Sequence, residues 1–452
     1  MHQSSGVAVR RHEGQMRGKR LRFRPRAEIW RPFNKFVLNT NRLCQIGKVR
    51  PHVQPSGKAL PLWQGAAWCF TESVPAGNLR EGGNDMNFDF SDDLKQLRDQ
   101  ARRFMSERCT PALVRRSLDG QEIYAADLWR AIAEMGWIGA AIPEEFGGAG
   151  LGYAGMCVLA EEIGRAVAPV PFGSTAYLAA EAILTAGSDA QRREYLPKLA
   201  DGSLIGCLAL SEGNGNPEPS AVHARVVGGR LTGAKWPVAD GGIADIAVVV
   251  ACDEHRQPGL FIAELADVRR RDLRTLDPTR NHARLDFDAK TVAKLGSGGW
   301  GAVQRVLDRA AILFAFEQVG GADACLQMAK DYAHERFAFG RPIGSFQAIK
   351  HKLADMYVAL ELARSNAYYG AWALGADATD LALAAATARV SATEAFHLAS
   401  KENIQTHGGI GFTWDVDCHL FYRRSKQLGL TIGSAPFWKD RLVDLLETRN
   451  AA

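Results

Sequence analysis

The chain has 452 residues, of which 46% are hydrophobic and 23% charged, and its formal net charge is +5. This composition is that of an ordinary globular protein, and no apolar run approaches the roughly 20 residues of a membrane-spanning helix. Residues 1–85 hold 15 of the 55 Lys and Arg but five of the 50 Asp and Glu, so the remainder carries −5. A body of this charge is unsuited to coating nucleic acid, so we expect neither a nucleic-acid partner nor a membrane span.

Residues 1–85 lack sustained hydrophobic periodicity and carry Arg, Pro and Gly in stretches such as RRHEGQMRGKRLRFRPR. They contain no segment with the length and cleavage site of a secretory signal, whereas an Arg-rich transit peptide or a nucleic-acid-binding arm fits their composition. Met86 begins a capped helical pattern, MNFDFSDDLKQLRDQARRFM. We therefore interpret residues 1–85 as a basic leader that is disordered or mis-assigned, with Met86 as the expected start.

The residues from Met86 to position 203 alternate helical stretches with short turns. The first helix is predicted to begin after Ser91, with two aspartates in its first turn. Residues 204–296 change to short β-branched runs such as IADIAVVVA and HARLDF, broken by Gly and Pro. The sequence thus predicts an N-terminal helical domain over 86–203 and a small β domain over 204–296.

In the last part of the chain, residues 297–452, apolar residues again recur at steps of three and four, as in Phe346, Ile349, Leu353 and Met356. This spacing is that of a helix packed in a bundle. The order helical, β, helical places the chain in the α+β fold class.

The eight cysteines are scattered along the chain, with no CxxC pair and no Cys/His cluster at the spacing of metal ligands. They indicate core thiols in a reducing compartment. We therefore expect a cytoplasmic protein that binds no metal.

Two glycine-broken turns carry residues suited to a phosphate-bearing ligand. In ERFAFGRPIGSFQAIKHKLADM, residues 335–356, the guanidinium of Arg336 suits a pyrophosphate better than lysine would. Gly340 allows the backbone to approach a ligand, as does the glycine run of QTHGGIGFT at 405–413. An inter-helix turn without a ligand explains either motif alone about as well, but it explains the two together less well.

Four segments resemble the acyl-CoA dehydrogenase family in order and spacing. They are IPEEFGGAGLG at 142–152, LPKLADGS at 196–203, RFAFGRPIGSFQ at 336–347 and QTHGGIGFT at 405–413. The resemblance covers residues 86 to about 447. It implies a middle β domain between an N-terminal helical domain and a C-terminal four-helix bundle. It also implies FAD as cofactor, an acyl-CoA thioester as substrate and electron-transfer flavoprotein or an equivalent as acceptor.

In this family the first turn reaches a flavin that is bound mainly by a neighbouring subunit. The resemblance implies that Arg336 faces the pyrophosphate, that Phe339 packs beside the flavin and that the amide of Gln347 forms a hydrogen bond. The glycine run after Gln405 would lie close to the adenosine end. The expected cofactor-binding residues are Arg336, Phe339, Gln347, Gln405, Gly408, Gly409 and Ser211.

The family's base, which removes the α-proton of the thioester, is missing from both of its usual positions. One position falls on Ile432 and the other on or near Ala310, and neither side chain takes up a proton. Glu317 lies about two turns beyond Ala310, and we interpret it as a helix-end or interface residue. Asp415 and Asp417 are interpreted as surface residues or helix caps. The catalytic residue therefore stays unassigned.

The β domain also departs from the family. Its flavin loop reads SEGNGNPEPS, which keeps Ser211 and Glu212 but loses the small-residue phosphate loop of the family. Its flavin-facing strand reads GAKWPVAD, with Pro237 and Ala239 at the usual Trp and Thr positions. Proline offers neither an N–H donor nor an indole face. These losses affect the half of the site that a subunit provides to its own flavin.

This asymmetry resembles the heteromeric acyl-CoA dehydrogenases of steroid or other bulky side-chain catabolism, in which two paralogous subunits form an α2β2 assembly. We therefore predict a subunit that lends part of the FAD site to a paralogous catalytic partner. One alternative is a flavin monooxygenase of the same fold, a homo-oligomer that needs no α-proton acceptor. A second alternative is a scaffold without flavin chemistry.

Overall fold

A computed structural model describes residues 91–296 and 298–451 of the chain. The predictions for residues 1–85 lie outside the described residues. Within the described ranges six cysteines are free and buried, as predicted for core thiols, and no group of side chains could hold a metal ion. None of the described helices is long and apolar enough to cross a membrane.

The N-terminal part is helical, as predicted. Ser91 is the N-cap, its hydroxyl accepting a hydrogen bond from the amide of Leu94 at 3.3 Å, with Asp92 and Asp93 in the first turn. The α-helices are α2 (Asp92–Arg108), α3 (Pro111–Leu118), α4 (Ala126–Glu134), α5 (Gly152–Arg165), α6 (Glu181–Ala186) and α7 (Asp189–Ala200). Between them lie a short 3-10 helix, η2 (Glu144–Phe146), and a π-helix, η3 (Gly173–Ala180), which runs directly into α6.

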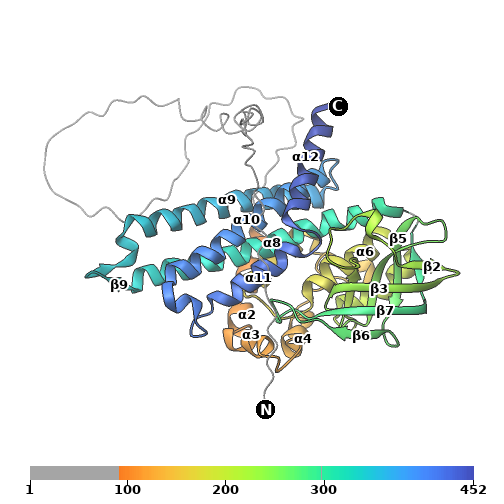
Figure 1. Cartoon of the computed structure of the whole chain (residues 1–452), viewed down its shortest axis with the longest axis horizontal. Coiled ribbons are helices and arrows are strands. Elements are labelled where there is room, and N and C mark those ends of the chain that lie inside the picture. The colour runs from red at the N-terminus through yellow and green to blue at the C-terminus, as the bar shows by residue number, and fades with distance from the viewer. Residues whose placement is uncertain (1–90, 297, 452) are drawn as a thin grey trace, which may run out of the picture. The chain divides into compact units, whose positions relative to one another are not determined.

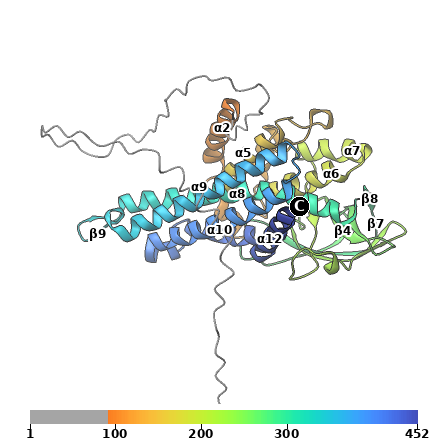
Figure 2. The ribbon, with the colours of Figure 1, turned by 90° about the horizontal axis from the view of Figure 1, so that it is seen from above.

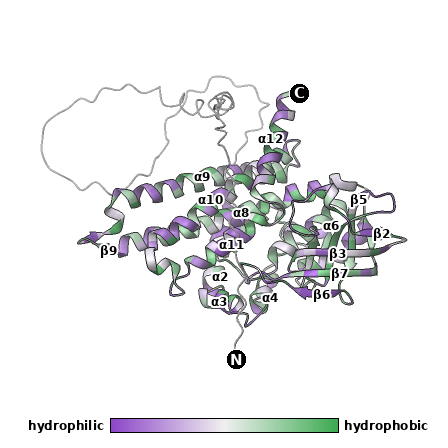
Figure 3. Ribbon diagram, viewed as in Figure 1, coloured by the Kyte–Doolittle hydropathy of each residue, from purple (hydrophilic) through white to green (hydrophobic). Residues whose placement is uncertain are grey.

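The middle part forms an eight-stranded mixed sheet in the order β6-β7-β3-β2-β4-β5-β8, with β1 also pairing with β4. The strands are β1 (Gly206–Ala209), β2 (Arg225–Val227), β3 (Arg230–Ala239), β4 (Ile246–Cys252), β5 (Pro258–Glu264), β6 (Arg269–Asp272), β7 (His282–Thr291) and β8 (Ala293–Leu295); η4 (Pro219–Ala221) precedes β2. The β-branched run IADIAVVVA supplies β4, buried along its length, and HARLDF supplies the alternating part of β7. Strand β6 reads RRRD and is strongly hydrophilic in Figure 3.

The C-terminal part is the predicted bundle, built from α8, α9, α10 and α11, with α12 packed against α10. The bounds are α8 (Gly299–Glu335), α9 (Gln347–Gly375), α10 (Leu381–His407), α11 (Cys418–Leu430) and α12 (Ala435–Ala451). Between α8 and α9 the chain forms a hairpin of β9 (Phe337–Ala338) and β10 (Arg341–Pro342), followed by η5 (Ile343–Ser345). Figures 1 and 2 both place this hairpin at the end of the bundle remote from the sheet.

Two glycines allow α5 of the N-terminal part to cross α8 of the bundle at close range. A Cβ at Gly164 would lie 1.9 Å from the carbonyl oxygen of Glu317, and one at Gly320 would lie 1.8 Å from that of Glu161. Larger residues at these two positions would push the helices apart. The crossing fixes the N-terminal helices against the middle of α8, where the buried Glu317 lies.

Candidate functional site

The two glycine-broken motifs meet at one end of the bundle. The first follows α8, and the second forms η6 (Gly408–Phe412) directly after α10. The ring of Tyr332 on α8 stacks on that of His407 on α10, with 4.2 Å between the ring centroids. An ion pair between Lys352 and Glu402 joins α9 to α10 at the same end. The fold therefore brings together the residues predicted from both motifs.

The hairpin presents an aromatic ring and a cation to solvent. Phe339 and Gly340 have φ values of 53° and 78°, so a left-handed tip holds the Phe339 side chain 95% exposed. The backbone of Arg336 is fixed because its carbonyl accepts a hydrogen bond from the amide of Ile343 at 2.8 Å. Its guanidinium is exposed and forms no ion pair within the described residues. An exposed guanidinium and an exposed ring on one hairpin suit a ligand that carries both phosphate and a flat ring system.

The second motif offers open backbone beside the hairpin. Gly408 has a φ of 65°, and a Cβ added at Gly408 or Gly409 would meet nothing within 4 Å. The side chains of Gln347 and Gln405 are exposed at the same end. Six of the seven predicted cofactor-binding residues therefore share one exposed end, and they fit the phosphate and adenosine portions of FAD.

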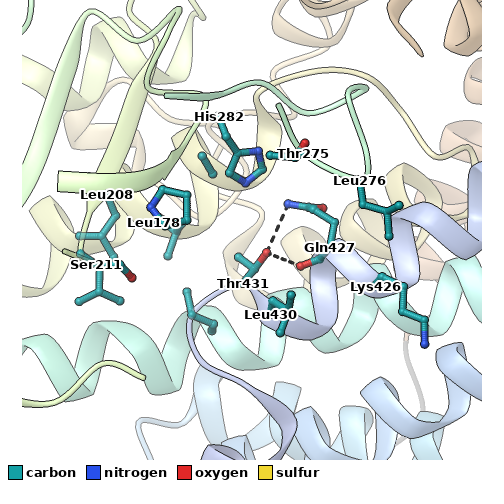
Figure 4. Close-up of a pocket in the computed structure, with 14 residues that line it drawn as sticks. Leu178, Leu208, Ser211, Thr275, Leu276, His282, Lys426, Gln427, Leu430 and Thr431 are labelled. Carbon is teal, nitrogen blue, oxygen red and sulfur yellow. Dashed lines mark hydrogen bonds between the residues drawn. The ribbon is translucent and has the colours of Figure 1, made fainter. Parts of the chain in front are cut away.

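Ser211, the seventh predicted residue, lies apart from the other six. It follows β1 in the sheet region, whereas the hairpin is at the remote end of the bundle (Figures 1 and 2). Ser211 instead lines a pocket of about 230 Å³ between the sheet and α11, drawn in Figure 4. Within one chain, these two groups of residues cannot contact the same part of a ligand.

The positions at which the sequence departs from the family surround this same pocket. Pro237, Ala239 and Ile432 line it together with Ser211 and several leucines. Its described lining contains no aspartate or glutamate. The pocket is therefore largely apolar and lacks a carboxylate base.

Two polar side chains in this pocket were not predicted from the sequence. The Nδ1 atom of His282 lies 3.1 Å from the carbonyl oxygen of Arg280. Because a carbonyl only accepts, Nδ1 carries the hydrogen, and Nε2 of the neutral ring is the acceptor. Gln427 donates from Nε2 to the hydroxyl of Thr431 at 3.3 Å, and its buried Oε1 has no partner among the described residues. Figure 4 shows both side chains at the pocket. No motif marks them, since one comes from β7 and the other from α11.

The pocket histidine should make stability depend on pH. Burial lowers the pKa of His282 below its usual 6.5, an effect that the nearby Asp240 charge opposes. The unfolded chain therefore binds the proton more readily, and folding stability should be lost as pH falls below about 6.5. The free energy of unfolding, measured by urea titration from about pH 7.5 to 5.5, should fall more steeply for the native chain than for His282→Gln. Parallel curves for the two proteins would show that His282 titrates as it does in the unfolded chain.

The structure also places the substitute bases that the sequence offered. Ala310 is fully buried, and Ile432 is 7% exposed. The sequence predicted a helix-end or interface residue at Glu317. The helix-end position is wrong, because Glu317 lies in the middle of α8, fully buried and paired with Arg280 at 2.7 Å. A carboxylate held in this way is a structural ion partner.

The two aspartates lie where the sequence predicted them. Asp417 is the N-cap residue of α11, and it accepts a hydrogen bond from Arg115 Nε at 2.9 Å. Asp415 is exposed and accepts one from the hydroxyl of Thr413 at 3.3 Å. Neither aspartate lines the pocket of Figure 4.

The flavin loop of the β domain is held by contacts within the chain. Glu212 accepts from Lys235 Nζ at 2.6 Å and from the amides of His223 and Ala224, each at 3.0 Å. This buried pair makes Glu212 a structural residue of the loop.

Farther along the same loop, Asn216 is bonded to the start of α12. Its Oδ1 accepts from the amide and the hydroxyl of Ser434 at 3.2 and 2.8 Å. The hydroxyl of Ser434 also accepts from the amide of Phe437 at 3.4 Å. The loop thus closes onto the bundle, and Pro237 on β3 offers no donor. This side of the chain does not fit FAD, whereas the hairpin end does.

Comparisons with known proteins agree with this architecture. Residues 91–203 match the model of the acyl-CoA dehydrogenase N-terminal domain, and residues 297–435 match that of the acyl-CoA dehydrogenase C-terminal domain. The acyl-CoA dehydrogenase IpdE2 of Mycobacterium tuberculosis is 36% identical over 339 residues, which cover 74% of this chain and 91% of IpdE2. FadE34 of the same organism is 34% identical over 360 residues, 78% of this chain and 47% of FadE34.

Similar solved structures include two whose names each join two components. A chain of the Tcur3481-Tcur3483 steroid ACAD G363A variant is 34% identical with a TM-score of 0.73, covering 80% of this chain and 99% of that one. A chain of the ChsE4-ChsE5 complex from Mycobacterium tuberculosis is 27% identical with the same TM-score, covering 80% and 99%. These matches extend over the described helical and sheet regions together. The chain therefore belongs to the acyl-CoA dehydrogenase family, whose oxidoreductases use FAD.

Proposed function

We propose that this chain is one subunit of a heteromeric acyl-CoA dehydrogenase and lends part of the FAD site to a paralogous partner. The observation that carries this proposal is the separation of the two half-sites. The hairpin end is open, cationic and aromatic, whereas the chain's own pocket lacks a carboxylate and its flavin loop is bonded to Ser434. Two similar solved structures whose names each join two components, one called a steroid ACAD and the other a complex, support the same arrangement.

In this proposal the paralogue supplies the carboxylate that removes the α-proton of an acyl-CoA thioester. FAD supplies the acceptor for the β-hydride, so that a Cα–Cβ double bond forms and the electrons pass on to electron-transfer flavoprotein or an equivalent. Arg336, Phe339, Gln347 and Gln405 of this chain hold and orient the cofactor. The substrate class is a steroid-derived or similarly bulky acyl-CoA, in a cytoplasmic α2β2 assembly.

The test is the flavin-to-protein ratio of this chain purified alone and after co-expression with its paralogue. We expect little flavin in the chain alone, and fewer flavins than subunits in the assembled enzyme. A homo-oligomer with one flavin in each subunit that consumes oxygen would contradict the proposal and favour the monooxygenase alternative. An assembly without flavin would favour the scaffold alternative.

Replacing Arg336 by Ala should weaken flavin retention in the assembled enzyme. One charge-assisted contact is worth about 1.5–3 kcal/mol, or roughly one to two decades in affinity. Equilibrium dialysis of FAD against the assembly measures this directly. Arg336→Lys should recover part of the loss, because it keeps the charge but not the planar fork. Lys350→Ala is a matched control, since it removes an exposed cation of α9 at the same end of the bundle. Equal FAD affinity in all four proteins would refute the assignment of Arg336.

A further inference from the structure

A second cleft, separate from the pocket of Figure 4, lies between residues 216–219, the first turns of α8 and one face of α12. It encloses about 380 Å³. Aromatic side chains line it from both helices, namely Trp300, Phe437 and Trp438. Four carboxylates, those of Glu218, Asp308, Asp440 and Asp444, also line it. The cleft is thus both aromatic and acidic.

The negative charge of this cleft is not neutralised within the described part of the chain. The one cation in its lining is Arg441. Its Nη2 atom donates to both carboxylate oxygens of Asp308, at 2.9 and 2.6 Å, so the charges of these two residues cancel. Glu218, Asp440 and Asp444 are exposed and form no ion pair with any described residue. The cleft therefore keeps a charge of about −3 at neutral pH.

The walls of the cleft are fixed before anything binds. The two hydrogen bonds from Ser434 to Asn216 hold the 216–219 loop against the start of α12. Trp438 is 1% exposed, and its Nε1 is buried without a partner in the described structure. Because this atom is buried, a ligand in the cleft cannot reach it. The preformed walls are the feature that suits the cleft to binding a partner.

The same chain carries an element of opposite chemistry, the hairpin after α8. It presents Arg336 and Arg341 with the rings of Phe337 and Phe339, which are 61% and 95% exposed. The cleft contains Trp300 in the first turn of α8, and the hairpin follows the last. At 1.5 Å per residue, the 37-residue helix separates them by about 55 Å. A contact between such a hairpin and such a cleft must therefore be made between two chains.

We infer that this cleft receives the arginine- and phenylalanine-bearing hairpin of the paralogous subunit. The inference rests on the proposed function and names the contact made by the partner. Glu218, Asp440 and Asp444 would pair with the partner's hairpin arginine, and Trp300 and Phe437 would pack against its phenylalanine. These carboxylates thereby supply the negative charge that a bound pyrophosphate supplies where a subunit holds its own flavin.

The test is a charge reversal on α12, with Asp440→Arg and Asp444→Arg introduced together in the co-expressed assembly. These two residues are one turn apart and share the face that lines the cleft. Like charges facing the partner's arginine should raise the dissociation constant at least tenfold, measured by mass photometry over a dilution series. Glu447→Arg is the matched control, since Glu447 is exposed on α12 but does not line the cleft. Circular dichroism and thermal melts establish that each variant is folded.

The second arm restores the pairing from the other side. Changing the arginine of the partner's hairpin to Glu should recover association with Asp440→Arg/Asp444→Arg. The inference would be overturned if Asp440→Arg/Asp444→Arg associated with the partner as tightly as the native chain does. It would also be overturned if the change of the partner's arginine to Glu did not restore association. Flavin content is read in the same samples, so that failure of the proposed function is seen separately.

If the native chain forms homo-oligomers in place of a heteromer, the proposed function fails but the inference is tested in the same way. The α12 variant is then mixed with Arg336→Glu/Arg341→Glu of the same chain. Association of this mixture, with neither variant associating alone, would support the contact. Equal association of every combination would overturn it, as would a native chain that stays monomeric both alone and with the paralogue.

Discussion

Loaded with FAD but without its partner, this chain should dehydrogenate bulky acyl-CoA thioesters about 10²–10⁴-fold more slowly than the assembled enzyme, the usual contribution of a positioned base. Both family positions for that base are apolar, at Ala310 and Ile432. No carboxylate lines the pocket among the described residues. Burial lowers the pKa of His282, which makes its imidazole a weaker proton acceptor than a free histidine.

The rate at which the flavin loses its colour on reduction by the thioester, measured without oxygen, gives this difference directly, because no external acceptor re-oxidises the flavin. The chain alone, the assembly, and an assembly whose partner lacks its glutamate are compared with the same thioester. Bleaching should be slow in the chain alone and in the assembly without the partner's glutamate, and fast in the intact assembly. Fast bleaching by the chain alone would contradict the subunit proposal. In that case His282→Gln shows whether the pocket histidine is the base, and Glu317, Asp415 and Asp417 are tested next.

The fold was predictable from the sequence because its signals are local. Ser91 caps its helix through a contact three residues away, and the run that forms β4 is apolar along its length, as a buried strand requires. That the two glycine-broken motifs lie together at one end of the bundle followed from the family resemblance. Spacing alone does not bring the ends of α8 and α10 together.

The details of the pocket and the cleft were not predictable, because they depend on tertiary contacts between distant segments. His282 and Gln427 are 145 positions apart in the printed sequence, and neither belongs to a motif. Helical counting placed Glu317 about two turns beyond Ala310, but it could not show that Arg280 from a loop and Arg424 from α11 approach it. The acidic cleft likewise combines Glu218 with Asp440 from separate segments.

Replacing Glu317 by Leu should lower the free energy of unfolding by about 3–5 kcal/mol, the usual cost of breaking a buried ion pair by removing one partner. Its carboxylate accepts hydrogen bonds from Arg280 at 2.7 Å and Arg424 at 3.4 Å. All three side chains are at most 4% exposed. The substitution leaves two guanidinium groups inside the protein, and Asp277, which Arg424 contacts at 2.7 Å, is then the one described carboxylate that forms an ion pair with either of them.

Urea unfolding measures this loss of stability in the native chain, in Glu317→Leu and in the surface control Glu447→Leu. The slope of the free energy of unfolding against urea concentration is compared among them, to check that the surface exposed on unfolding is unchanged. Adding Arg280→Met to Glu317→Leu should recover part of the loss, because the double variant removes an uncompensated charge and keeps apolar volume in its place. A Glu317→Leu effect within about 0.5 kcal/mol, typical of surface sites, would mean that water or rearrangement relieves the charges. Such an outcome would make Glu317 a candidate base again. A large loss of stability that Arg280→Met partly restores would instead identify Glu317 as the ion partner that joins α8 to α11 and to the segment between β6 and β7.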